Sequence, residues 1–151
     1  MPPATTSKSS EEPKEVSFDD MKGCIDKTTF DQILEMDDDD DREFSQGIVF
    51  GFFEQAETTF DKMENALDKK NLGELSSLGH FLKGSSATLG LTKVKEACEK
   101  IQHFGAQKDE TGTTDEPDDS VSLKNIEKTL GQAKEDYREV EKFLRKYYAS
   151  D

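Results

Sequence analysis

The chain has 151 residues, the size of one domain, and 36% of them are charged against 32% that are hydrophobic. Its formal net charge of -14 at pH 7 repels phosphate backbones and anionic lipid surfaces, which argues against binding to nucleic acids or membranes. Two cysteines far apart in sequence, and no apolar run of about 18 residues, argue against a disulfide framework and a membrane span and favour a reducing intracellular compartment.

The N-terminal part combines a polar tail, a short helix and an acidic run. Residues 1–16 are predicted to be disordered, because they cannot bury enough apolar area to offset the entropy lost on ordering. The next apolar segment, TTFDQILEM, predicts a short helix capped by Thr28 or Thr29. The five aspartates at 37–41 lack the ligand spacing, glycine and distal glutamate of a calcium loop, so we interpret them as a solvated turn whose last members cap the following helix.

Four long amphipathic helices follow, because apolar residues recur at steps of three and four in four segments. The stripes are Phe44, Ile48, Phe52, Ala56, Phe60, Met63 and Leu67; then Leu75, Leu78, Leu82, Ser86 and Leu89; then Val94, Ala97, Cys98, Ile101 and Phe104; and finally Leu123, Ile126, Leu130, Ala133, Tyr137, Val140, Leu144 and Tyr147. Gly90 and Gly105 are expected to end the second and third helices. Residues 106–120, with six acidic residues and no apolar period, predict an exposed flexible linker.

These elements predict an all-α fold: an up-and-down antiparallel four-helix bundle over residues 17–151, with a short extra N-terminal helix. The last stripe would also suit a dimeric coiled coil. We favour a monomeric bundle because the other three long helices need an apolar partner as well. Cys98 lies on a stripe, so we expect it to be a buried, inert thiol.

The second long helix carries one histidine, in the stretch LSSLGHFLKGSSATLG at 75–90. At about 100° per residue, His80 points away from the leucine stripe, and its surface neighbours are small residues apart from Lys83, one turn further on. Glycine inside a helix costs roughly 1 kcal/mol relative to alanine. Gly84 beside His80 therefore suggests that another molecule approaches the backbone closely.

Metal binding and base-assisted nucleophilic catalysis are not expected at His80. No His or Cys lies four residues away, His103 is on another helix, and no acidic residue flanks His80 on its face. The ammonium of Lys83 would disfavour the imidazolium form and would stabilise an anion placed on the ring. A neutral imidazole with a cation beside it and no acid is suited to carrying a phosphoryl group.

The motif HFLKGSSATLG resembles the H-x-x-K-G-S core of the histidine-containing phosphotransfer domains, and more closely the fungal phosphorelay intermediates of multistep osmostress signalling. The resemblance extends through FDQILEMDDDD, FFEQAETTF and CEKIQHFG. It implies that His80 accepts a phosphoryl group from the receiver domain of a hybrid histidine kinase and passes it to that of a response regulator. Lys83 would balance the phosphate charge, and Gly84 would let the receiver close over the imidazole. It also implies a protein of cytoplasm and nucleus without a cofactor of its own, since the receiver would hold magnesium.

The same resemblance assigns supporting and docking residues. Ser85 would make local hydrogen bonds, and Gln102 would reach toward the histidine from the next helix. Related proteins often place a basic residue where this chain has Ala106, and Lys108 is the nearest substitute. The apolar positions expected to dock the receiver are Ile33, Met36, Phe44, Ile48 and Phe81.

Two other classes stay open. In the dimerisation domain of a histidine kinase, an acid usually follows the phosphorylated histidine, whereas Phe81 follows here. The chain also has no glycine-rich nucleotide loop, so no ATP-dependent kinase activity of its own is expected. The other class is a non-catalytic helical scaffold that binds receivers without phosphotransfer, and the intact set of His80, Lys83 and Gly84 argues against it.

Overall fold

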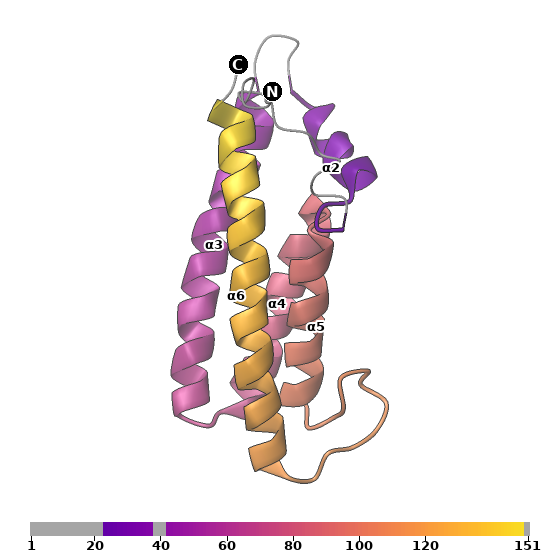
Figure 1. Cartoon of the computed structure of the whole chain (residues 1–151), viewed down its shortest axis with the longest axis vertical. Coiled ribbons are helices and arrows are strands. Elements are labelled where there is room, and N and C mark those ends of the chain that lie inside the picture. Colours follow the sequence, from indigo (N-terminus) through magenta and orange to yellow (C-terminus); the bar gives the residue numbers. More distant parts are fainter. Residues whose placement is uncertain (1–22, 38–41, 150–151) are drawn as a thin grey trace, which may run out of the picture.

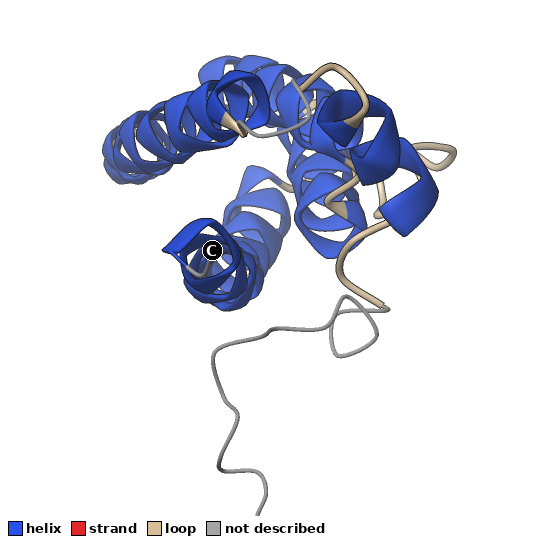
Figure 2. Cartoon of the chain, turned by 90° about the horizontal axis from the view of Figure 1, so that it is seen from above, coloured by secondary structure: helices blue, strands red, loops and turns tan. Residues whose placement is uncertain are grey.

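The computed structural model describes residues 23–37 and 42–149, so the predicted tail and most of the aspartate run lie outside the described residues. The helices are α2 (Lys27–Leu34), α3 (Glu43–Asp68), α4 (Leu72–Leu89), α5 (Thr92–Gly105) and α6 (Asp119–Ala149). Figure 1 shows α3 to α6 alternating in direction along one long axis, with α2 beside the end where α4 passes into α5. The predicted bundle with its extra short helix is confirmed. Figure 2 looks along the bundle and shows helices joined by loops, and within the described ranges no strand is present.

The core collects apolar side chains from each of the five helices in the described part of the chain. The stripes of α4, α5 and α6 lie largely where their spacing predicts. Leu75, Leu82 and Leu89 are at most 2% exposed. Cys98 is fully buried as expected, and burial raises the pKa of its thiol to about 12, which makes it inert near neutral pH. None of the described helices combines the length and apolarity needed to cross a bilayer.

The first turns of α3 depart from the predicted stripe. Val49 and Phe53 enter the core, whereas Phe44 is 49% exposed and Ile48 is only partly buried. Each step of four residues turns a helix by about 40° beyond a full circle, so Phe44 lies about 80° around α3 from Phe52. Steps of four alone therefore drift off the buried face, so Phe44 turns outward and Ile48 lies at the edge of the core.

Two glycines bring the backbones of α4 and α5 into direct contact. A Cβ atom on Gly79 would lie 2.7 Å from the Cys98 carbonyl oxygen and 2.8 Å from the Gln102 backbone nitrogen. A Cβ atom on Gly105 would lie 2.6 Å from the Ser76 backbone nitrogen. Atoms cannot approach so closely, so these two glycines set the spacing of the helix pair that carries His80.

The start of α2 is fixed by Asp26 rather than by a threonine. The Asp26 carboxylate accepts hydrogen bonds from the backbone N–H of Thr28 and the hydroxyl of Thr29, so the predicted threonine cap is wrong by two to three residues. The backbone N–H of Asp26 donates to the Gly90 carbonyl at 2.6 Å. Gly90 ends α4 in the left-handed conformation, with φ of 75°, as predicted. These bonds join α2 to the α4–α5 turn.

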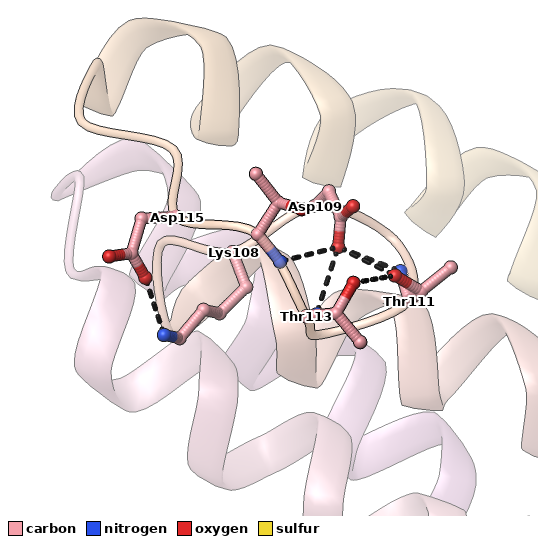
Figure 3. Close-up of polar contacts among 6 residues, drawn as sticks. Lys108, Asp109, Thr111, Thr113 and Asp115 are labelled. Atoms are coloured by element: carbon pink, nitrogen blue, oxygen red, sulfur yellow. Dashed lines mark hydrogen bonds and ion pairs between the residues drawn. The ribbon is translucent and has the colours of Figure 1, made fainter.

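The segment between α5 and α6 is exposed, as predicted, but it is a hydrogen-bonded loop rather than an unstructured linker (Figure 3). The Asp109 carboxylate accepts hydrogen bonds from the Thr111 hydroxyl and from the backbone N–H groups of Thr111 and Thr113. These bonds, the Thr111 hydroxyl first among them, lower the pKa of the Asp109 carboxyl. Lys108 pairs with Asp115 across the loop. Helix α6 begins at Asp119, so the predicted linker is slightly too long.

Candidate functional site

His80 lies on the solvent side of α4, away from the bundle core. Its side chain is exposed, whereas Leu75 and Leu82 on the opposite side are fully buried. A Cβ atom on Gly84 would have no atom outside its own helix within 4 Å. The surface beside the imidazole is therefore open, and Gly84 is not required by packing inside this chain.

Helix α5 forms one flank of this surface. The Ser76 hydroxyl donates to the Gln102 carbonyl at 2.9 Å, so Ser76 belongs to the α4–α5 contact rather than to the open surface that its helical position suggests. The side-chain oxygen of Gln102 is buried and accepts no hydrogen bond from the residues that the structure describes. Gln102 thus stands opposite Gly79, which precedes His80, and its role toward the histidine stays a prediction.

The same helix places an acid beside the cation of the site. Glu99 Oε2 lies 4.0 Å from Lys83 Nζ, and the Lys83 side chain is 26% exposed. Glu99 lies on α5, so residue spacing along α4 alone does not reveal an acid near Lys83. Glu99 stands one turn before Gln102, which was predicted to reach toward His80, and this spacing on α5 is the sequence signal that could have revealed Glu99.

Helix α3 forms the other flank. The Ser85 hydroxyl donates to Gln55 Oε1 at 3.1 Å, so its partner lies on another helix, whereas a local hydrogen bond was predicted. Beside this pair, a hollow of about 300 Å³ lies between α3 and α4. Its lining includes Gly47, Ile48, Gly51, Gln55, Ser85 and Thr88.

Several of the apolar positions predicted to dock a receiver are exposed. Met36 is 66% exposed, Phe44 is 49% exposed and Phe81 is 48% exposed, whereas Ile48 is partly buried against the core. Ile33 is different, because it is only 7% exposed and belongs to the core. Its predicted docking role is therefore not supported, since a buried side chain offers no surface to a partner.

The remaining polar candidates are engaged elsewhere. The His103 ring is half-buried, its Nδ1 lies 2.8 Å from the Glu110 carbonyl oxygen, and Gly112 of the loop covers the ring. Lys108, predicted as the nearest substitute for a basic residue at the position of Ala106, instead pairs with Asp115 in the same loop. Among the described residues, no group of three or more His, Cys, Asp or Glu side chains could hold a metal ion.

Comparisons with known proteins point to one family. The model of the Hpt domain matches residues 48–141. Multistep phosphorelay regulator 1 of Schizosaccharomyces pombe is 46% identical over 138 residues, which cover 89% of this chain and 47% of that protein. Phosphorelay intermediate protein YPD1 of Saccharomyces cerevisiae is 52% identical over 82 residues, which cover 54% of this chain and 48% of that protein. The chain thus spans about half the length of the curated relatives it matches.

Solved structures have the same architecture. Ypd1 of Saccharomyces cerevisiae, in a co-crystal with the receiver domain of its downstream response regulator Ssk1, superposes with a TM-score of 0.73 at 37% identity. That match covers 84% of this chain and 95% of the Ypd1 chain. The histidine-containing phosphotransfer protein MtHPt2 of Medicago truncatula has a TM-score of 0.57 at 22% identity over 85% of this chain and 84% of its own, which shows a shared fold.

Proposed function

This chain belongs to the Hpt domain family, and from that premise we propose that it relays phosphoryl groups between the aspartates of receiver domains through His80. One observation carries the proposal: the imidazole is exposed on α4, beside a glycine whose surroundings are open. A receiver's active site can approach such a surface without displacing any side chain of the bundle.

The chemistry assigned to His80 is a reversible exchange of one bond. An imidazole nitrogen attacks the phosphorus of the receiver's aspartyl phosphate, the P–O bond breaks, and its electron pair leaves with the aspartate carboxylate. Transfer to the next receiver is the reverse step with a new carboxylate as nucleophile. Lys83, one turn along α4, balances the charge of the phosphoryl group. Magnesium belongs to the receiver in this scheme.

The partners are the receiver domains of a hybrid histidine kinase and of response regulators in osmostress signalling. The co-crystal of Ypd1 with the receiver domain of Ssk1 supports this class of partner. Met36, Phe44, Ile48 and Phe81 supply apolar surface for docking. We further propose that the protein works in cytoplasm and nucleus, which imaging of a tagged full-length chain would test.

A non-catalytic scaffold is the second candidate, since the same surface could bind a receiver without chemistry. The two are separated by incubating the purified chain with a receiver domain that carries radiolabelled aspartyl phosphate. Appearance of label on this chain supports relay. Binding of the receiver with no label on this chain would support the scaffold instead.

A further inference from the structure

The Lys83 ammonium beside His80 lies close to the carboxylate of Glu99, which has no part in the relay chemistry described above. Glu99 Oε2 lies 4.0 Å from Lys83 Nζ, and the two side chains come from different helices. Contact of the α5 backbone with Gly79 sets how far apart α4 and α5 stand at this level. Main-chain packing therefore fixes the spacing of the two backbones that carry Glu99 and Lys83.

Lys83 is the cation that lies one turn from His80 on the same helix. Ala106 occupies the position after Gly105 and offers no charge. Lys108 is paired with Asp115 in the loop that follows. A negative group on His80 therefore meets an ammonium that already has an anionic neighbour.

We propose that Glu99 is a positioning residue that draws the Lys83 ammonium to the α5 side of His80 and competes with the phosphoryl group for it. The inference rests on the proposed function of His80. Competition weakens the stabilisation that Lys83 gives to phospho-His80, so Glu99 shortens the lifetime of the phosphorylated state and favours release of the phosphoryl group.

Hydrolysis of phospho-His80 measures this effect without a receiver. The oxygen of a water molecule bonds to phosphorus as the N–P bond breaks, the bonding pair returns to the imidazole nitrogen, and the protons of water divide between phosphate and solvent or ring. The full chain is phosphorylated with phosphoramidate, a small phosphoryl donor, and loss of phosphohistidine is followed in Glu99→Gln and wild type.

Glu99→Gln should slow hydrolysis about two- to fivefold at low salt, the range of an exposed ion pair. The difference should vanish near 1 M salt, where the Debye length is about 3 Å. Glu96→Gln is the matched control, since Glu96 stands one turn earlier on α5 and lines the hollow between α5 and α6. It should hydrolyse at the wild-type rate.

A double variant separates action through Lys83 from direct repulsion of the phosphate. In a Lys83→Ala background, Glu99→Gln should change nothing, because no ammonium is left to position. An effect of Glu99→Gln that persists in that background, or no effect in the wild-type background, overturns the proposal.

The unphosphorylated protein gives a second test that does not depend on His80 chemistry. The ¹⁵Nζ resonance of Lys83 should shift in Glu99→Gln and stay in place in Glu96→Gln. An unmoved Lys83 resonance in Glu99→Gln would contradict the ion pair itself. Failure of receivers to label the wild type would instead count against the proposed relay while leaving both of these measurements valid.

Discussion

Two glycines of α4, Gly84 and Gly79, should respond to alanine in opposite ways. Gly84→Ala places a methyl group in open space, so the free energy of unfolding should rise by up to about 1 kcal/mol from improved helix propensity. Gly79→Ala places the same methyl group 2.7 Å from the Cys98 carbonyl oxygen and 2.8 Å from the Gln102 nitrogen. Both are backbone atoms, so relief requires α4 and α5 to move apart.

Forced separation of packed elements costs about 1–3 kcal/mol or more, which exceeds the gain in helix propensity. With a net loss of about 2 kcal/mol, the melting temperature of a 151-residue domain should fall by about 4–8 °C in Gly79→Ala. Gly84→Ala should melt at or slightly above the wild-type temperature. Thermal and urea unfolding followed by circular dichroism measure both variants under one condition.

A third variant connects this packing to function. Gly84→Gln should fold, since glutamine is a good helix former, but its side chain stands about 40° around α4 from His80. It should lower receiver affinity or transfer rate far more than Gly84→Ala does. The reasoning is refuted if Gly79→Ala is as stable as wild type, or if Gly84→Gln is the variant that unfolds.

Three further outcomes follow from the structure. Lys83→Ala should slow transfer while changing the free energy of unfolding by less than about 1 kcal/mol, because a surface ion pair contributes little; unchanged single-turnover kinetics would show that the receiver supplies the charge. A thiol reagent at pH 8 should modify Cys24 and leave Cys98 unreacted until the protein unfolds. Burial raises the pKa of the Cys98 thiol to about 12, so its contribution to the free energy of unfolding is present below about pH 9 and is lost as pH rises toward 12. Asp109→Ala should speed proteolysis within residues 106–118 without altering transfer. Because the pKa of the Asp109 carboxyl is lowered, the wild-type loop should stay protected from proteolysis until pH falls below the ordinary aspartate pKa of about 4. Equal cleavage of variant and wild type at pH 7 would show that the Asp109 hydrogen bonds do not hold the loop together.

The buried faces of α4, α5 and α6 could be predicted from periodicity, because their apolar residues recur at steps of both three and four, which keep the side chains on one face of a helix. It failed at the start of α3, where Phe44 and Ile48 extend the stripe by steps of four alone, so Phe44 turns outward and Ile48 is only partly buried. Ile33 was predicted to dock a receiver but is buried, since a two-turn helix packed on the bundle end buries whichever side meets it.

The site was predictable where it lies on one helix and hidden where two helices meet. His80, Lys83 and Gly84 follow from spacing within α4 alone. Gly79 acts across the α4–α5 contact, and its sequence neighbours carry no sign of the partner helix. Glu99 acts across the same contact, and only its position one turn before Gln102 pointed to it. The Asp109 loop was missed because its order comes from side-chain to backbone hydrogen bonds rather than from apolar burial.

The central claim is that one histidine carries the phosphoryl group between two receivers, and a pulse–chase through the full chain tests it most directly. A receiver with radiolabelled aspartyl phosphate is mixed with the chain, removed, and replaced by an unlabelled second receiver. In wild type, the label should pass onto the chain in an acid-labile, alkali-stable form and then onto the second receiver. In His80→Gln, with the same helical content, neither step should occur. Equal labelling of His80→Gln, or label that stays on the wild-type chain when the second receiver is added, would contradict the account.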